Sequence, residues 1–171
     1  MNPGEEAELV RRAAGDDLAA FAALVRVHEA PLRRYLARLA GDEGDDLAQE
    51  TLLAAWRALG QWRGKGNFGG WLRAIATRRF LDRHRRRRPQ TQALAGLDVA
   101  APCDGRDRRI AIDRALARLP ERERAVALLL FAEGHSHSEA AAILAVPLGT
   151  LKSIAARARL ALIPLLEGVA P

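Results

Sequence analysis

The side chains best suited to contact a polyanion are concentrated in one band of the sequence. Residues 61–90 contain ten Lys or Arg, one acidic residue and two tryptophans, for a net charge of +9, whereas residues 1–60 carry −4 and residues 91–171 carry +1. Cations neutralise phosphates and aromatic rings stack on unpaired bases, so together they suit single-stranded nucleic acid. The band therefore indicates a nucleic-acid-binding surface, and the alternative is a basic face that is merely solvated.

Short polar and basic side chains also follow a proline-containing turn at residues 145–147. Thr150, Lys152 and Ser153 lie near the start of the helix expected there, and Arg157 lies one turn beyond Ser153. A helix that reads duplex DNA needs short polar residues near its start to approach phosphates and base edges. An arginine on the same helix can pair with guanine through two hydrogen bonds. These residues predict a second DNA-contacting surface.

No group of residues has the spacing of a catalytic site. The sequence lacks a G-x-S-x-G elbow, a P-loop, paired cysteine ligands and a helical His-carboxylate motif, so we expect no enzymatic activity, no cofactor and no metal site. His135 and His137 have no carboxylate cluster beside them, which is more typical of solvated residues at a helix start. Cys103 is the single cysteine, and the sequence assigns it no role.

The composition favours an all-α protein. Ala, Leu and Arg are abundant while β-branched and aromatic residues are few, and this balance suits helices better than strands. The longest apolar run, residues 125–132, is far shorter than the roughly 18 residues of a membrane span. The first ten residues include three glutamates and lack the apolar core of a signal peptide. We therefore expect a cytoplasmic protein without membrane insertion.

Hydrophobic spacing predicts two helices that precede the basic band. The first covers about 21–39, with a bend near Pro31, and ends at Gly41. The second begins at Asp45-Asp46, whose negative charge suits the positive end of a helix. The stripe expected to be buried on this second helix consists of Leu52, Leu53, Trp56 and Leu59.

The basic band itself predicts a loop followed by a third helix. Residues 60–70 hold five glycines, and the helix is expected to run from Phe68 or Trp71 into the arginines at 85–88, where a proline ends it. Trp62 in the loop has two interpretations. It either anchors the loop by packing or stacks on an unpaired base.

The rest of the chain predicts a linker and a second helical domain. Residues 89–108 show no apolar periodicity and contain two prolines, two glycines and three aspartates, a composition typical of linkers. We therefore expect two small helical domains, 1–88 and 109–171, joined by a flexible linker at 89–108.

The second domain has the outline of a helix-turn-helix. Ser136 and Glu139 form a capping box that begins the short first helix of this motif, and the turn at 145–147 leads into the longer second one. The other expected helices cover about 109–119, 121–131 and 148–163, the last ended by Pro164.

Two separate parts of the sequence resemble the extracytoplasmic-function (ECF) sigma factors, the minimal two-domain type of bacterial sigma factor. Asp45-Asp46-Leu47-Ala48-Gln49-Glu50-Thr51 is similar to the family's acidic D-x-x-Q-E helix, and Phe68-Gly69-Gly70-Trp71-Leu72-Arg73-Ala74-Ile75-Ala76 to its F-x-x-W-L-x-x-I-A helix. The family's promoter-reading helix-turn-helix is similar to four segments of this chain, namely Leu119-Pro120, residues 134–141, residues 146–153 and Arg157-Ala158-Arg159. Both parts in this order resemble the family more specifically than either alone.

The resemblance implies particular partners. It implies binding to the RNA polymerase core, through the clamp of the largest subunit and the flap, and to promoter DNA, with control by an anti-sigma factor. The clamp would be bound by residues that share one face of the acidic helix, at three- and four-residue steps. These residues are Asp46, Gln49, Glu50 and Leu53.

The resemblance also implies two promoter contacts. The loop before Trp71 and the basic helix after it would open the minus-ten element, and the last helix would read the minus-thirty-five element. The chain departs from the family at Arg78, where an asparagine is common, and at Ile154, where an arginine is frequent. The implied residues are Arg63, Lys65, Asn67, Arg78, Arg79 and Arg83 for the minus-ten element, and Thr150, Lys152, Ser153 and Arg157 for the minus-thirty-five element.

Two other classes of protein stay open on the sequence alone. An ordinary helix-turn-helix regulator would leave the acidic helix and the basic tryptophan band unexplained. A sigma mimic that occupies an anti-sigma factor without binding DNA would need only the packing residues. The chain keeps its DNA-facing cations, among them Lys65 and Arg157, which favours a working sigma factor.

Overall fold

The computed structural model describes residues 1–62, 67–87 and 105–166. All regular structure in these residues is helical, which confirms the all-α prediction. The chain divides into two compact units, Met1–Phe80 and Leu81–Pro171. The predicted domain limits stay predictions, because residues 88–104, with Cys103, lie outside the described residues.

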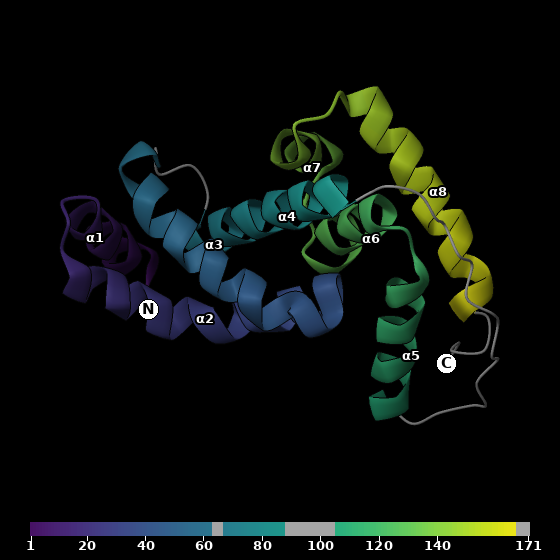
Figure 1. Cartoon of the computed structure of the whole chain (residues 1–171), viewed down its shortest axis with the longest axis horizontal. Coiled ribbons are helices and arrows are strands. Elements are labelled where there is room, and N and C mark those ends of the chain that lie inside the picture. The colour runs from purple at the N-terminus through teal and green to yellow at the C-terminus, as the bar shows by residue number, and fades with distance from the viewer. Residues whose placement is uncertain (63–66, 88–104, 167–171) are drawn as a thin grey trace. The chain divides into compact units, whose positions relative to one another are not determined.

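The first unit begins with a helix that the hydrophobic spacing did not predict. α1 (Pro3–Ala13) starts from a capping box, in which the Asn2 side chain accepts a hydrogen bond from the Glu5 backbone N–H at 2.8 Å and the Glu5 carboxylate accepts one from the Asn2 N–H at 3.0 Å. Proline at the first helical position adds a φ angle already set for a helix. α1 packs along α2 (Leu18–Ala40), as Figure 1 shows.

α2 continues through Pro31 and ends at Gly41, whose φ of +58° favours glycine. A short 3-10 turn, η1 (Gly41–Glu43), then leads into α3 (Gly44–Ala58). α3 approaches α2 closely, since a Cβ on Gly44 would lie 3.0 Å from the backbone nitrogen of Ala37. A side chain at position 44 would therefore push the two helices apart.

The buried face of α3 differs from the predicted stripe. Only Leu59 of the four predicted residues is buried, at the start of the 3-10 turn η2 (Leu59–Gln61), whereas Leu53 is 58% exposed. Small residues on the face of α3 opposite Leu53 allow the close approach to α2. Thr51 is on that buried face, and Leu53, two residues later, lies about 200° around the helix from it. Leu53 therefore points away from α2. The buried residues of α3 are Gly44, Leu47, Ala48, Thr51 and Ala55, and Leu52 and Trp56 are half-buried.

α4 (Phe68–Arg87) supplies the other side of this core. Its apolar residues at four-residue steps from Phe68 to Phe80 are buried. Thr77 is buried beside them, where its hydroxyl lies 2.7 Å from the Arg73 carbonyl and 2.7 Å from the Tyr35 hydroxyl of α2. The hydroxyls of Tyr35 and Thr77, enclosed between α2 and α4, thus have partners, as buried polar groups require.

The second unit begins with α5 (Gly105–Arg118), which starts four residues before the predicted Arg109. The residues at 106–108 are charged, so they extend the helix without adding to its apolar pattern. Arg124 connects α5 to the helix that follows. Its Nη2 donates hydrogen bonds to the backbone carbonyls of Ala117 at 2.8 Å and Leu119 at 3.0 Å, and burial lowers the pKa of this guanidinium.

α6 (Glu121–Ala127) passes directly into a π-helical turn, η3 (Leu128–Ala132). α6 packs against the last helix, which covers 148–166. Val126 of α6 and Leu129 of η3 lie in the core of this unit. The rest of the core comes from the helix-turn-helix and contains Ala140, Ala141, Leu151, Ile154 and Ala155.

α7 (His137–Leu144) begins at the predicted capping box. The Ser136 hydroxyl accepts a hydrogen bond from the Glu139 N–H at 3.2 Å, and the Glu139 carboxylate accepts one from the Ser136 N–H at 2.8 Å. The Ser136 N–H, and then the Ser136 hydroxyl, which donates to the same carboxylate at 2.7 Å, lower the pKa of Glu139. A lowered folded-state pKa means that this contact stabilises the unit above the unfolded-state pKa and is lost as the pH falls through the folded-state value.

The turn after α7 holds Ala145 at a φ of +52°, and α8 (Leu148–Leu166) follows it. The prediction that Pro164 ends this helix is wrong, because α8 continues to Leu166. Proline removes one backbone donor and strains the preceding turn, but the N–H groups of the next two residues can still bond four positions back.

Candidate nucleic-acid and protein interfaces

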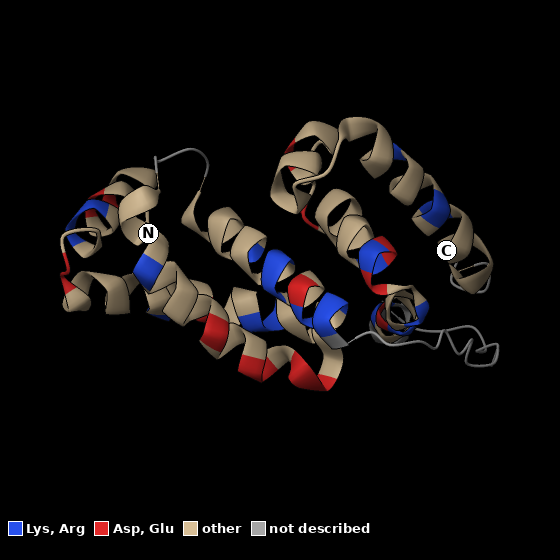
Figure 2. Cartoon of the chain, turned by 45° about the horizontal axis from the view of Figure 1, so that its top comes forward, with Lys and Arg blue, Asp and Glu red and all other residues tan. Residues whose placement is uncertain are grey.

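The outer face of α3 carries the four residues predicted to bind a protein partner. Asp46 and Gln49 are exposed, Glu50 is half-buried and Leu53 is exposed. Their spacing of three, one and three residues places them on one side of the helix, away from the face that packs on α2. Figure 2 shows acidic residues gathered over the first turns of α3. The structure therefore brings these four side chains together as one solvent-facing surface.

The cations of α4 do not share a single face. Arg78 is exposed, whereas Arg79 and Arg83 are half-buried and lie one turn apart on the same side. Arg79 Nη2 donates to the Glu50 carboxylate of α3 at 3.3 Å, with both side chains 40% exposed. Figure 2 shows the basic residues in bands along the C-terminal half of α4. Arg79 thus joins the acidic outer surface of α3 to the basic residues of α4.

The start of α4 is fixed by a local cap. Asn67 is exposed, and its side-chain oxygen accepts a hydrogen bond from the Gly70 N–H at 2.5 Å. This is the position at which asparagine is favoured before a helix, because it satisfies a backbone donor that has no partner inside the helix. The other two residues predicted for this surface outside α4, Arg63 and Lys65, lie outside the described residues.

Three aromatic rings surround this helix start. The ring centroids of Phe68 and Trp71 lie 5.6 Å apart, and the Trp62 ring lies 6.1 Å from Phe68 and 6.0 Å from Trp71. This contact confirms the packing interpretation of Trp62. Trp71 is half-buried, as is Trp56, which packs on Phe21 at 4.9 Å. Trp56 and Trp71 therefore lie at the edge of the core, whereas the sequence predicted a buried Trp56.

α8 presents the predicted DNA-reading residues to solvent. Thr150, Ser153 and Arg157 follow one another at three- and four-residue steps along one exposed stripe, and Lys152 flanks it. Ser153 also donates its hydroxyl hydrogen to the Gly149 carbonyl at 3.1 Å. The opposite face of α8 is buried in the core of the second unit through Leu151, Ile154, Ala155 and Ala158.

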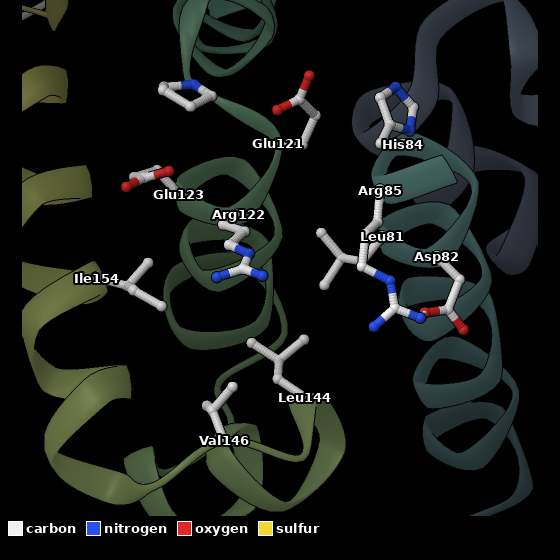
Figure 3. A pocket seen from close by; sticks show the side chains of 11 residues that line it. Leu81, Asp82, His84, Arg85, Glu121, Arg122, Glu123, Leu144, Val146 and Ile154 are labelled. Carbon is white, nitrogen blue, oxygen red and sulfur yellow. The ribbon is translucent and has the colours of Figure 1, made fainter. Parts of the chain in front are cut away.

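Arg157 has a partner that the sequence did not identify. Glu123 projects from the first turns of α6 toward α8 (Figure 3), and its carboxylate accepts a hydrogen bond from Arg157 Nε at 2.9 Å. The Glu123 side chain is 13% exposed and the Arg157 side chain 58%. Because a guanidinium has five N–H donors, this contact orients Arg157 and leaves its terminal nitrogens available to another acceptor. The two residues are 34 positions apart, so no local sequence pattern indicates the pair.

No single helix of the described residues has the length and apolar character to cross a membrane; α7 and α8 meet the length and composition test only as a pair, bent by 105° at the break between them.

Two family models match the chain. Sigma-70 region 2 matches residues 24–90, which begin within α2, and Sigma-70 region 4 matches residues 109–162, which begin within α5 and end within α8. Residues 1–23, with the whole of α1, precede both matches.

Curated relatives and solved structures agree with these matches. The ECF RNA polymerase sigma factor SigM of Mycobacterium tuberculosis is 36% identical over 168 residues, covering 94% of this chain and 84% of SigM. EcfG of Rhodopseudomonas palustris is 33% identical over 135 residues, covering 75% of each. The sigma factor RpoE in complex with the anti-sigma factor NepR from Bartonella quintana aligns with a TM-score of 0.64 at 28% identity, over 86% of this chain and 96% of RpoE. CnrH in complex with the cytosolic domain of CnrY aligns with a TM-score of 0.66 at 27% identity, over 97% of this chain and 99% of CnrH.

Proposed function

The chain belongs to the extracytoplasmic-function family of RNA polymerase sigma factors. On that basis we propose which of its exposed surfaces bind the polymerase and which bind the two promoter elements. A sigma factor binds the polymerase core and promoter DNA and directs the core to promoters. We propose in addition that this chain acts in the cytoplasm and contributes no catalytic chemistry of its own.

We assign polymerase binding to the exposed face of α3. Asp46 and Gln49 offer acceptors to basic or polar groups on the clamp of the largest subunit, and Leu53 offers an apolar contact that is 58% exposed in the isolated chain. An exposed leucine beside carboxylates suits a protein partner better than it suits DNA, since carboxylates repel phosphates. The flap of the polymerase is the contact that we assign to the second unit.

We assign the minus-ten element to the start and the basic side of α4. Asn67 and Arg78 are exposed there, and Arg79 and Arg83 add charge along the helix. Arg63 and Lys65 belong to the same proposal on the strength of the sequence. Charge of this density attracts the non-template strand once the duplex opens, because each contact neutralises a phosphate and releases a counterion.

We assign the minus-thirty-five element to the exposed stripe of α8. Thr150 and Ser153 lie in the first turns, where a recognition helix approaches the major groove, with Lys152 beside them. Arg157, oriented by Glu123, is the residue best suited to reach guanine. Ile154 is buried in the core of the unit, so it leaves this stripe without the arginine that the family often has nearby.

We also propose an anti-sigma factor as a regulatory partner. The solved relative RpoE is in complex with the anti-sigma factor NepR, and this chain aligns with 96% of RpoE. The sigma-mimic alternative is less well supported, because a chain that only occupied an anti-sigma factor would not need the exposed polar stripe on α8 or the exposed Arg78.

The observation that carries this proposal is the presence of two different surfaces on the first unit, the acidic outer face of α3 and the basic residues Arg78 and Arg79 of α4, in a chain whose second unit contains a helix-turn-helix. A regulator that used only its helix-turn-helix would need neither. The test is transcription of fragmented genomic DNA by core polymerase of the source organism, with the transcript starts mapped by sequencing.

The expected result is a reproducible set of starts that appear only with the chain present and share elements near minus-ten and minus-thirty-five. Asp46→Lys should then weaken core binding at least about tenfold, because it reverses an exposed charge within the proposed contact. Asp42→Lys, the same change on η1 outside the α3 face, is the matched control and should bind normally. If no start depends on the chain, the proposed function is wrong.

A further inference from the structure

Glu6 of α1 reaches across the first unit to the first residue of α4. Its Oε1 accepts a hydrogen bond from the Phe68 backbone N–H at 2.7 Å, and its Oε2 lies 3.1 Å from Nε2 of His28 on α2. The Glu6 side chain is 17% exposed and the His28 side chain 15%. Glu6 and Phe68 are 62 positions apart, so this is a contact made by the fold.

The contact completes the capping of α4 from a second side. The first backbone N–H groups of a helix have no partner within it, and they form its positive end. Asn67 satisfies the Gly70 N–H from within the same segment, while Glu6 satisfies the Phe68 N–H from a different helix. A carboxylate at this end is favourable in charge as well as in hydrogen bonding. The Asn67 cap shapes the first turn of α4, and the Glu6 contact fixes the position of that turn within the unit.

His28 forms the other part of this support. Its ring lies edge-on to the Phe68 ring with 5.3 Å between centroids. A Cβ on Gly69 would lie 3.0 Å from His28 Nδ1, so the backbone of α4 rests directly on the histidine. The start of α4 is therefore held by a carboxylate, an imidazole and a close backbone contact together.

We propose that Glu6 is a positioning residue for promoter opening. Through the Phe68 N–H it holds the start of α4, and with it the exposed Asn67, in the place from which the separated minus-ten strand is bound. This inference rests on the proposed function. It extends that function to α1, which precedes the matched Sigma-70 region 2.

The electrostatics favour a positioning role over a direct DNA contact. A carboxylate beside the basic band would repel the phosphates that the band attracts. Glu6 is largely shielded from solvent, and its two oxygens face the Phe68 N–H and the His28 ring. Its effect on DNA therefore passes through the geometry of α4.

The test compares Glu6→Ala and Glu6→Gln with Glu8→Ala. Glu8 lies on the same helix but is exposed and pairs with Arg11, so its replacement removes the same charge without touching α4. Each variant is assembled with core polymerase on the strongest promoter found in the transcription screen. That promoter is supplied once as a duplex and once with the minus-ten segment already unpaired, and strand opening is followed by 2-aminopurine fluorescence. Folding is monitored by the fluorescence of the three tryptophans, which all lie in the first unit.

Glu6→Ala should open the duplex promoter at least roughly tenfold less well, the lower end of the range expected for losing a charged hydrogen bond, and should lose clearly less activity on the unpaired template, where the strands are already separated. Glu6→Gln keeps an oxygen acceptor for the Phe68 N–H, so its loss of duplex opening should be smaller than that of Glu6→Ala. Glu8→Ala should resemble the unchanged protein on both templates.

Normal opening by Glu6→Ala would overturn the inference, and so would an equal loss on both templates, because a merely structural defect does not distinguish them. If Glu6→Ala proves too unstable to assay, Glu6→Gln decides by the same comparison of templates. An unchanged protein that is inactive on both templates would instead contradict the proposed function.

Discussion

Two of the arginines predicted to contact DNA are already engaged in ion pairs within the chain. Arg79 pairs with Glu50, and Arg157 pairs with Glu123. Arg79 and Glu50 are both 40% exposed, and exposed pairs of this kind typically contribute only about 0–1 kcal/mol. A phosphate can therefore compete for Arg79 at small cost. The Glu123 side chain is less exposed than that of Glu50, and its ion pair with Arg157 mainly orients the Arg157 guanidinium.

The two proposed DNA surfaces should respond differently to the loss of one arginine. Arg157→Ala removes a base-edge contact and should cost about 1–3 kcal/mol, with relaxed preference at one minus-thirty-five position. Arg78→Ala removes an exposed phosphate contact and should weaken binding to all promoters alike, lowering the salt slope by about one unit. Holoenzyme binding to matched and single-base-changed promoters over a range of salt concentrations measures both.

Equal weakening of all promoters by Arg157→Ala would show that this side chain is not the reader. Lys152 would then be the better candidate, because it is exposed on the same helix. Arg159 is less suited, since its guanidinium lies 5.8 Å from the centre of the Phe131 ring, a cation–π contact that holds it on its own unit.

At the scale of the elements, the turn between α7 and α8 is held in an unfavourable conformation. Ala145 has φ +52° and ψ +46°, in the left-handed region that costs a residue with a Cβ about 1 kcal/mol or more. The turn is kept in this conformation by backbone hydrogen bonds from Ala145 and Val146 to the last turn of α7. The resulting geometry sets the angle between α7 and α8, the two helices of the motif.

Ala145→Gly should therefore stabilise the second unit by about 0.5–1 kcal/mol, because glycine adopts this conformation without a steric penalty and only part of the gain is offset by the freer unfolded chain. Ala142→Gly, at an exposed position inside α7, is the matched control and should destabilise it by about 1 kcal/mol. Thermal unfolding followed by circular dichroism gives both values.

Tryptophan fluorescence provides the internal reference, since no tryptophan lies in the second unit. The transition seen by fluorescence should be the same in both variants. A lower melting temperature for Ala145→Gly would mean that the alanine methyl group makes a stabilising contact worth more than the strain.

At the scale of the whole molecule, charge is distributed unevenly along the chain. Residues 1–60 carry a net −4, and residues 61–90 carry +9. The acidic face of α3 belongs to the same compact unit as Arg78 and Arg79 of α4, and the ion pair between Glu50 and Arg79 joins the two helices. Attraction of DNA to Arg79 is therefore opposed by the Glu50 carboxylate at 3.3 Å, well within the roughly 10 Å over which charges act at 0.1 M salt.

The isolated chain should consequently bind promoter DNA weakly, and core polymerase should make the binding specific by covering the acidic face. Fluorescence anisotropy with a labelled promoter duplex, with and without core, measures this. Asp46→Asn should strengthen non-specific binding by the isolated chain at low salt while weakening core binding, because it removes one repelling charge. Nanomolar, sequence-specific binding by the chain alone would contradict the prediction.

Much of the helical architecture follows from local patterns in the sequence. The capping box at Ser136 and Glu139, the glycine after α2 and the buried four-residue steps of α4 are all features of neighbouring residues, which act through helix periodicity and backbone geometry. The two sigma motifs are local in the same sense. α1 escaped prediction although its Asn-Pro-x-Glu start is also a capping signal, because the helix carries few apolar residues.

Which residues support the functional surfaces was decided by the tertiary structure. Glu6 meets Phe68 across 62 positions and Glu123 meets Arg157 across 34, and neither distance corresponds to a period of a helix. The exposure of Leu53 was likewise not predictable from local patterns, since it depends on which face of α3 the small residues allow α2 to cover. Periodicity and capping act within a few residues, so the sequence by itself determined the helices, the family and the cations. Contacts between distant segments arise only when the helices pack, and for that reason only the fold decided how those cations and the start of α4 are held.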